Sequence, residues 1–92
     1  MKPYDWNLDK NAFLQTLRGV SFDDIVKAIS EEGLIDTIPH HNQKKYPGQK
    51  IYIVVINAYC WAVPFVETEE KIFLKTIYPS RKAAKKYLKK GE

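Results

Sequence analysis

Lys50–Glu67 has the sequence KIYIVVINAYCWAVPFVE, and this stretch indicates the fold class more strongly than any other. Lys50–Ile56 is rich in β-branched residues and therefore predicts a buried strand. Asn57-Ala58 is expected to form a tight turn into a second strand, Tyr59–Glu67. Because Pro64 has no backbone N–H, we expect a bulge or an edge position where it interrupts this strand.

Further strands are predicted on both sides of this hairpin. Leu34–Ile38 alternates apolar and polar residues, and the polar loop His40–Gln49 separates it from the hairpin. Thr68–Glu70 predicts a turn into a last strand, Lys71–Tyr78. The strands at 50–56, 59–67 and 71–78 are expected to form an antiparallel meander. Tyr4-Asp5-Trp6 can add a short edge strand at the start of the chain.

Two helices are predicted before the sheet and one after it. Asn7 can cap the first helix and Gly19 can end it, and its expected buried residues are Phe13, Leu14 and Leu17. Ser21 and Asp24 form a capping pair for an amphipathic second helix, whose apolar residues are Phe22, Ile25, Val26 and Ile29. Ser80 begins a final helix with an apolar stripe of Ala83, Ala84, Tyr87 and Leu88. The expected fold is α+β, an antiparallel sheet with two N-terminal helices and one C-terminal helix.

Length and composition limit the class of protein. The 92 residues fit a single domain, 1–92. No apolar run approaches the roughly 20 residues of a transmembrane helix, and the polar Met1–Lys10 does not resemble a signal peptide. Cys60 is the only cysteine, so no internal disulfide can form. We therefore expect a cytoplasmic protein that does not associate with membranes.

Positive charge is concentrated at the C-terminal end of the chain. Lys71–Glu92 contains eight Lys or Arg residues and one acid, a net charge of +7. Residues 1–70 contain seven Lys or Arg residues and ten acids, a net charge of −3, which leaves the formal +4 of the whole chain. Such asymmetry focuses a positive field on one face and predicts a polyanionic partner.

Three stretches between Tyr4 and Tyr87 carry a resemblance to a known family. They are Asp5-Trp6-Asn7 with Lys10 and Asn11, then Arg18–Asp24, and finally Ile77–Ala83. In this order and with these lengths they resemble the BrnT family of toxin–antitoxin ribonucleases, a branch of the RelE-like toxin superfamily. The resemblance implies a RelE/BrnT-like fold and a metal-independent endoribonuclease that inhibits translation and needs no cofactor.

The resemblance also implies partners. RNA, expected to be mRNA, is the substrate. An antitoxin encoded alongside the toxin, usually with a ribbon–helix–helix DNA-binding domain, would cover the basic cleft and neutralise the toxin. The complex would bind operator DNA only through that antitoxin.

Four candidate catalytic residues follow from the family pattern and its surroundings. Arg81 matches the arginine of the closing motif, where a guanidinium could clamp a phosphate with two bonds. Tyr78 lies close to it and could stack on a base or donate a proton. Lys75 could contact phosphate, but strand alternation places it opposite Tyr78 unless a bulge intervenes. Lys10 matches an early lysine of the family.

His40 is a fifth catalytic candidate. It and His41 are the only histidines, and near neutral pH a histidine is readily tuned as an acid or base. The alternative is a pair of ordinary loop histidines. Zinc-type spacing is absent, so no metal site is predicted.

The last helix supplies the candidate nucleic-acid-binding residues. They lie opposite its apolar stripe and are Lys82, Lys85, Lys86, Lys89 and Lys90. An ordinary solvated helix face is the alternative.

Two other functions remain open. One is a non-catalytic nucleic-acid-binding module, and the other is a protein-interaction domain that docks through a sheet edge or the region of Trp6 and Trp61.

Overall fold

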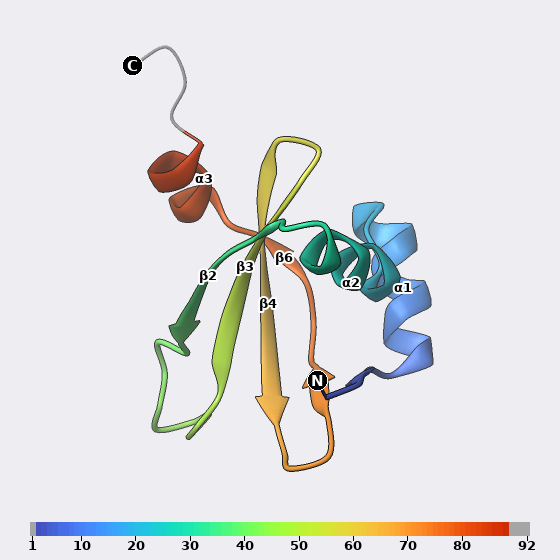
Figure 1. The fold of residues 1–92 in the computed structure, drawn as a ribbon, viewed down its shortest axis with the longest axis vertical. Coiled ribbons are helices and arrows are strands. Elements are labelled where there is room, and N and C mark those ends of the chain that lie inside the picture. The colour runs from blue at the N-terminus through green and yellow to red at the C-terminus, as the bar shows by residue number, and fades with distance from the viewer. Residues whose placement is uncertain (1, 89–92) are drawn as a thin grey trace.

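The computed structural model describes residues 2–88, which form three helices and a mixed sheet (Figure 1). The elements in chain order are β1 (Tyr4–Asp5), α1 (Leu8–Arg18), α2 (Phe22–Ser30), β2 (Leu34–Pro39), β3 (Lys50–Ile56), β4 (Tyr59–Glu67), β5 (Ile72–Leu74), β6 (Tyr78–Pro79) and α3 (Arg81–Tyr87). The predicted α+β class is confirmed, with two helices before the main strands and one after them. No helix in this part of the chain is long and apolar enough to cross a membrane.

The sheet has the strand order β1-β5-β4-β3-β2, and β6 also pairs with β4. The β2–β3, β3–β4 and β4–β5 pairs are antiparallel, as the predicted meander requires. However, β1 pairs with β5 in parallel, with Tyr4 opposite Ile72, and the amide of Ile72 donates to the carbonyl of Pro3 at 2.9 Å. The prediction of a purely antiparallel sheet is therefore wrong, because the chain start adds to the free edge of β5 in the same direction.

The predicted last strand, Lys71–Tyr78, is split into β5 and β6, and Pro64 explains the split. Residues 65–67 of β4 pair with β5 and residues 61–62 pair with β6, which leaves Pro64 opposite the gap. Its carbonyl oxygen accepts from the amide of Lys75 at 2.8 Å, so this side of Pro64 faces the last strand. A residue's N and O point to the same side of a strand, and Pro64 has no N–H to complete the ladder there. The expected irregularity thus lies opposite Pro64, in the neighbouring strand.

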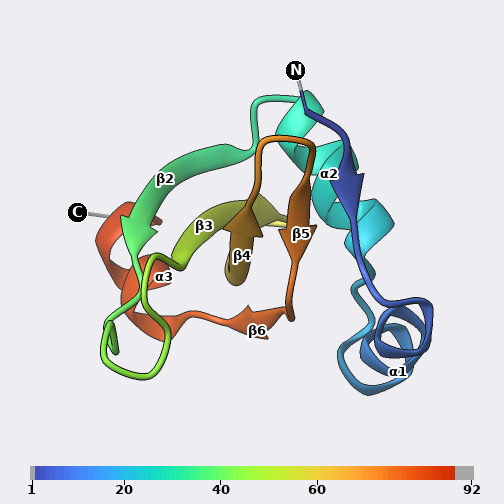
Figure 2. The same cartoon turned by 90° about the horizontal axis from the view of Figure 1, so that it is seen from below.

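The two faces of the sheet are covered by different helices (Figure 2). The core on the α1–α2 face contains the buried residues Leu14, Val20, Phe22, Ile25, Tyr52, Val54, Val63, Phe65, Ile72, Leu74 and Ile77. The core on the α3 face contains Ile51, Ile53, Cys60, Ala62 and Ala83. Alternate residues of β3 and β4 therefore belong to different cores, as the period of a strand requires.

The first two helices differ in how much of their apolar surface they bury. In α2 the predicted capping pair is present, since the Ser21 hydroxyl accepts from the Asp24 amide and the Asp24 carboxylate accepts from the Ser21 amide. In α1 only Leu14 is buried, whereas Phe13 and Leu17 remain 56% and 57% exposed. The prediction that all three are buried is wrong, because the short helix reaches the core with one side and leaves the Phe13–Leu17 stripe outside it.

Tyr52 makes the fold sensitive to alkaline pH. Burial, followed by the neighbouring Tyr4 hydroxyl and Glu67 carboxylate, raises the pKa of Tyr52 to about 12 from a usual value of 10. The folded state holds this proton more tightly than the unfolded state, so the contribution to stability is complete below pH 10 and is lost as pH rises to about 12. The free energy of unfolding measured in urea should fall across this range, and the fall should be about 3 kcal/mol smaller in Tyr52→Phe than in the wild type. An equal loss in the variant would contradict this assignment.

Candidate nucleic-acid interface

α3 is anchored to the sheet at its start and along one side. The amide of Ser80 donates to the carbonyl of Cys60 at 3.0 Å, and its hydroxyl accepts from the amide of Ala83 at 3.1 Å. Ala83 is buried in the core that also contains Ile53, and Leu88 packs against it. These contacts fix the apolar side of α3 against the sheet, so its other side faces solvent.

The solvent side of α3 is a cationic surface, here named the α3 basic surface, made of Arg81, Lys82, Lys85 and Lys86. All four side chains are exposed, and the helix sequence RKAAKKY contains no acid. The ion pairs found within residues 2–88, Lys2–Glu67 and Lys71–Asp5, do not involve it. Its cations are therefore available to an anionic partner. The candidates Lys89 and Lys90 lie outside the described residues.

A hydrogen bond ties the end of α3 to the edge strand β2. The Tyr87 hydroxyl donates to the Asp36 carboxylate. This bond, followed by one from the Thr37 amide and the charge of Lys86, holds the pKa of Asp36 below its usual value. The carboxylate therefore stays charged at neutral pH and accepts from Tyr87, which fixes the C-terminal end of α3.

A hollow of about 880 Å³ separates α3 from the β3–β4 turn. Ala58, Ala84 and Leu88 supply apolar lining, and the residues of the α3 basic surface supply charge. The turn itself is tight, since Asn57 and Ala58 both have left-handed backbones with φ of +52° and +61°. The hollow can therefore accept a group with an apolar part and a negative charge.

Tyr78 and Arg81 flank the point where β6 leads into α3. Tyr78 pairs with Ala62 and packs against the core beneath α3, where burial raises the pKa of its hydroxyl. At neutral pH the phenol keeps its proton and can act as a donor but not as a base. Arg81 is the first residue of α3 and is exposed, so its guanidinium can reach a phosphate in solution.

Lys75 lies in the gap between β5 and β6, on the same face as Tyr78. Leu74 and Ile77 are three residues apart but belong to the same core, so the alternation of the strand is broken between them. The Lys75 ammonium lies 5.7 Å from the centre of the Phe73 ring, on the face opposite Leu74. The interruption needed to bring Lys75 and Tyr78 to one face is therefore present.

Lys10 and His40 lie away from this group. Lys10 is on α1, which packs on the other side of the sheet, and its ammonium lies 5.9 Å from the Phe13 ring centre. The C-terminal end of β2 points away from α3 (Figure 1), and His40 is the residue that follows it. The structure therefore brings Lys75, Tyr78 and Arg81 to one face and leaves these two candidates elsewhere.

The surroundings of His40 are those of a structured loop. Its ring centre lies 4.6 Å from that of His41 and 4.5 Å from that of Tyr46, and its Nδ1 accepts from the Asn42 amide at 3.0 Å. Burial and the neighbouring His41 lower the pKa of His40. The neutral ring therefore serves as an acceptor that shapes the loop.

Two features on the α3 face of the sheet were not predicted from the sequence. Phe73 lies between Lys71 and Lys75, which the period-two pattern K-x-F-x-K could have indicated. Asp5 pairs with Lys71 at 2.7 Å, which requires the unpredicted parallel pairing of β1 with β5.

Among residues 2–88, no three potential metal ligands gather at one place. No protein-family model, curated protein or solved structure matches the chain.

Proposed function

We propose that this protein is a cytoplasmic, metal-independent endoribonuclease of the BrnT type, the toxin of a type II toxin–antitoxin module. The observation that carries the RNA-binding part of the proposal is the α3 basic surface, whose cations have no acid on their own helix and border an apolar hollow. Phosphate contacts of this kind dominate nucleic-acid affinity. The BrnT resemblance supports the finer assignment to toxin ribonucleases.

The proposed reaction is transesterification within the RNA chain. The 2′-oxygen attacks phosphorus as its proton passes to water, the P–O5′ bond breaks, and a proton is added to the leaving 5′-oxygen. Arg81 would clamp the phosphate and stabilise its developing charge. Tyr78, whose raised pKa keeps it protonated, is suited to supply the proton to the leaving oxygen. Lys75 would add a second cation on the same face.

The antitoxin would compete with RNA for the same surface. An acidic segment seated on the α3 basic surface would neutralise the cations that otherwise hold phosphate, which is how binding would inhibit the toxin. We expect the antitoxin to carry a ribbon–helix–helix domain, through which the complex would bind operator DNA.

A non-catalytic nucleic-acid-binding module is the second candidate. The observation that favours it is the separation of Lys10 and His40 from the Tyr78–Arg81 pair, which leaves fewer acid–base groups beside the phosphate site. Such a module would use the same lysines without altering the RNA.

Incubation of purified protein with RNA in the presence of EDTA distinguishes the ribonuclease from the non-catalytic module. Products ending in 2′,3′-cyclic phosphate and 5′-hydroxyl support the ribonuclease, whereas intact RNA that remains bound supports the module.

Removing three charges from the α3 basic surface should weaken RNA binding in a salt-dependent way. We expect the triple variant Lys82→Gln/Lys85→Gln/Lys86→Gln to bind single-stranded RNA about 100-fold more weakly at 0.1 M salt, because each lost phosphate contact lowers the salt slope by about 0.7. Fluorescence anisotropy across a salt series measures both quantities. The control Arg18→Gln/Lys27→Gln removes two charges, one from α1 and one from α2, and should change neither the affinity nor the salt slope. Equal losses in the two proteins would place the RNA elsewhere.

A further inference from the structure

A second basic and aromatic group lies on β5, apart from α3. The ammonium groups of Lys71 and Lys75 each lie 5.7 Å from the centre of the Phe73 ring. Phe73 itself is half-buried, although Ile72 and Leu74 on either side of it are buried. An aromatic ring left partly open between two lysines is suited to contact a base and its phosphate together.

This group is on the same face of the sheet as Tyr78 and α3. Ile72 and Leu74 belong to the core on the α1–α2 face, so Phe73 between them points to the α3 face. Its partner in β4 is Val66, and the break opposite Pro64 then returns Tyr78 to the α3 face. Phe73, Lys75 and Tyr78 thus follow one line along the last strand that ends at Arg81.

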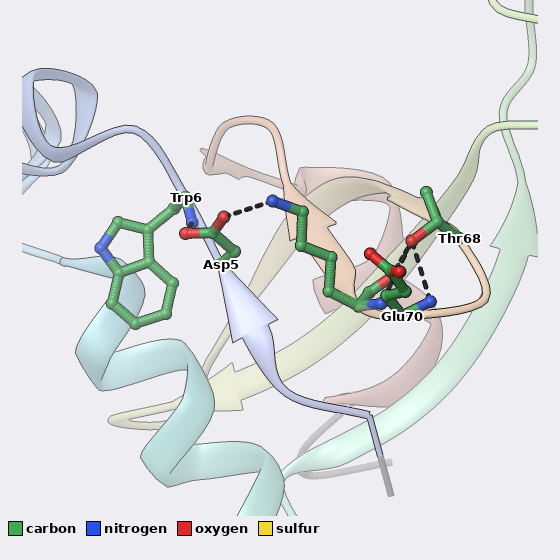
Figure 3. A network of polar contacts seen from close by, with 5 residues as sticks. Asp5, Trp6, Thr68 and Glu70 are labelled. Atoms are coloured by element: carbon green, nitrogen blue, oxygen red, sulfur yellow. Dashed lines mark hydrogen bonds and ion pairs between the residues drawn. The ribbon is translucent and has the colours of Figure 1, made fainter.

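The two lysines are held differently. Lys71 forms a 2.7 Å ion pair with Asp5, drawn in Figure 3 beside the turn that Thr68 holds through bonds from the amides of Glu70 and Lys71. Lys75 is exposed, and the ion pairs found within residues 2–88 do not include it. Lys71 is therefore fixed beside the ring, whereas Lys75 is free to leave the ring for a phosphate and so open it to a base.

We infer that Phe73 is a stacking platform for an unpaired base of single-stranded RNA, with Lys75 on the adjoining phosphate. The inference rests on the proposed function and names its substrate class. From Phe73 the RNA backbone follows the last strand to Tyr78, a path of about 17 Å at the rise of a β-strand, and continues to Arg81 at the start of α3. Selectivity for single strands follows because a paired base in an RNA duplex has no free face to offer.

The test is binding of a short single-stranded RNA, fluorescently labelled and 2′-O-methylated so that it cannot be cut, beside a duplex of the same sequence. Phe73→Leu keeps an apolar side chain, and we expect it to weaken single-strand binding 5- to 100-fold with an unchanged salt slope. Phe73→Trp should bind as tightly as the wild type, because it restores a stacking surface. Lys75→Gln should lower the salt slope by about 0.7.

The outcomes separate this inference from the proposed function. Single-strand affinity of Phe73→Leu equal to that of the wild type overturns the platform, as does an equal loss of single-strand and duplex binding. In either case a loss in the α3 triple variant leaves the proposed RNA binding intact. Failure of the wild-type protein to bind any RNA overturns both the stacking platform and the proposed function. Circular dichroism of each variant checks its fold. Should Phe73→Leu unfold, Lys75→Gln at its exposed position decides the test, because an unchanged salt slope in that variant overturns the inference.

Discussion

Replacing Phe22 with alanine is expected to lower the free energy of unfolding by about 3–5 kcal/mol, the usual cost of removing a buried aromatic side chain. Phe22 is fully buried at the first turn of α2, and its ring stacks on that of Trp6 at a centroid distance of 5.7 Å. Its amide also donates to the side-chain oxygen of Asn11 at 2.7 Å. The truncation would therefore leave a cavity where the chain start, α1 and α2 meet.

This loss is large relative to the total stability of a small domain, which is about 5–15 kcal/mol. Urea unfolding followed by circular dichroism measures it directly. Phe13→Ala is the matched control, since Phe13 is 56% exposed and its removal should change stability by less than about 1 kcal/mol. Equal destabilisation by the two substitutions would contradict the placement of α1, because it would require Phe13 to be buried.

The parts of the fold that depend on local chemistry could be predicted from the sequence. The capping pair of Ser21 and Asp24 identifies the start of α2, and Ser80 caps α3 in the same way. The β-branched run of β3 and the turn at Asn57-Ala58 identify the central hairpin. These signals lie within a few residues of the structure they specify, so no knowledge of distant contacts is needed.

Features that depend on distant contacts could not be predicted in the same way. In the parallel pairing of β1 with β5, Tyr4 lies opposite Ile72. No local sequence pattern indicates which strand the start of the chain pairs with, or in which direction. The exposure of Phe13 and Leu17 depends on how far α1 extends past the core, which their spacing does not encode. Local patterns place residues on a face of one element but do not say which faces meet.

The candidate site shows the same division. Arg81 and the lysines of α3 follow from helical periodicity, whereas the grouping of Lys75 with Tyr78 depends on a break in the neighbouring strand. Pro64 could have indicated that break from the sequence, because its missing N–H interrupts the hydrogen-bond ladder between β4 and the last strand. The consequence is that a proline in β4 determines which side chains of β5 and β6 share the face of the sheet that α3 covers.

Under the proposed function, Arg81→Ala is the substitution expected to affect cleavage most, with a loss of about 100- to 1000-fold in the rate for bound RNA. A guanidinium on the scissile phosphate stabilises charge that grows as the 2′-oxygen attacks, so its contribution is greater in the transition state than in the bound substrate. Single-turnover cleavage with enzyme in excess separates this effect from weaker binding. Because Arg81 is exposed at the start of α3, the variant should unfold at the same urea concentration as the wild type.

Two control variants make the result specific to the position and geometry of Arg81. Arg18→Ala removes the only other arginine, at the exposed end of α1, and should leave the cleavage rate unchanged. Arg81→Lys keeps the charge but loses the planar fork that holds two phosphate oxygens, so it should recover only part of the rate. Full recovery would mean that Arg81 acts as a point charge. Undiminished cleavage by Arg81→Ala would instead remove this residue from the reaction and leave RNA binding as its role.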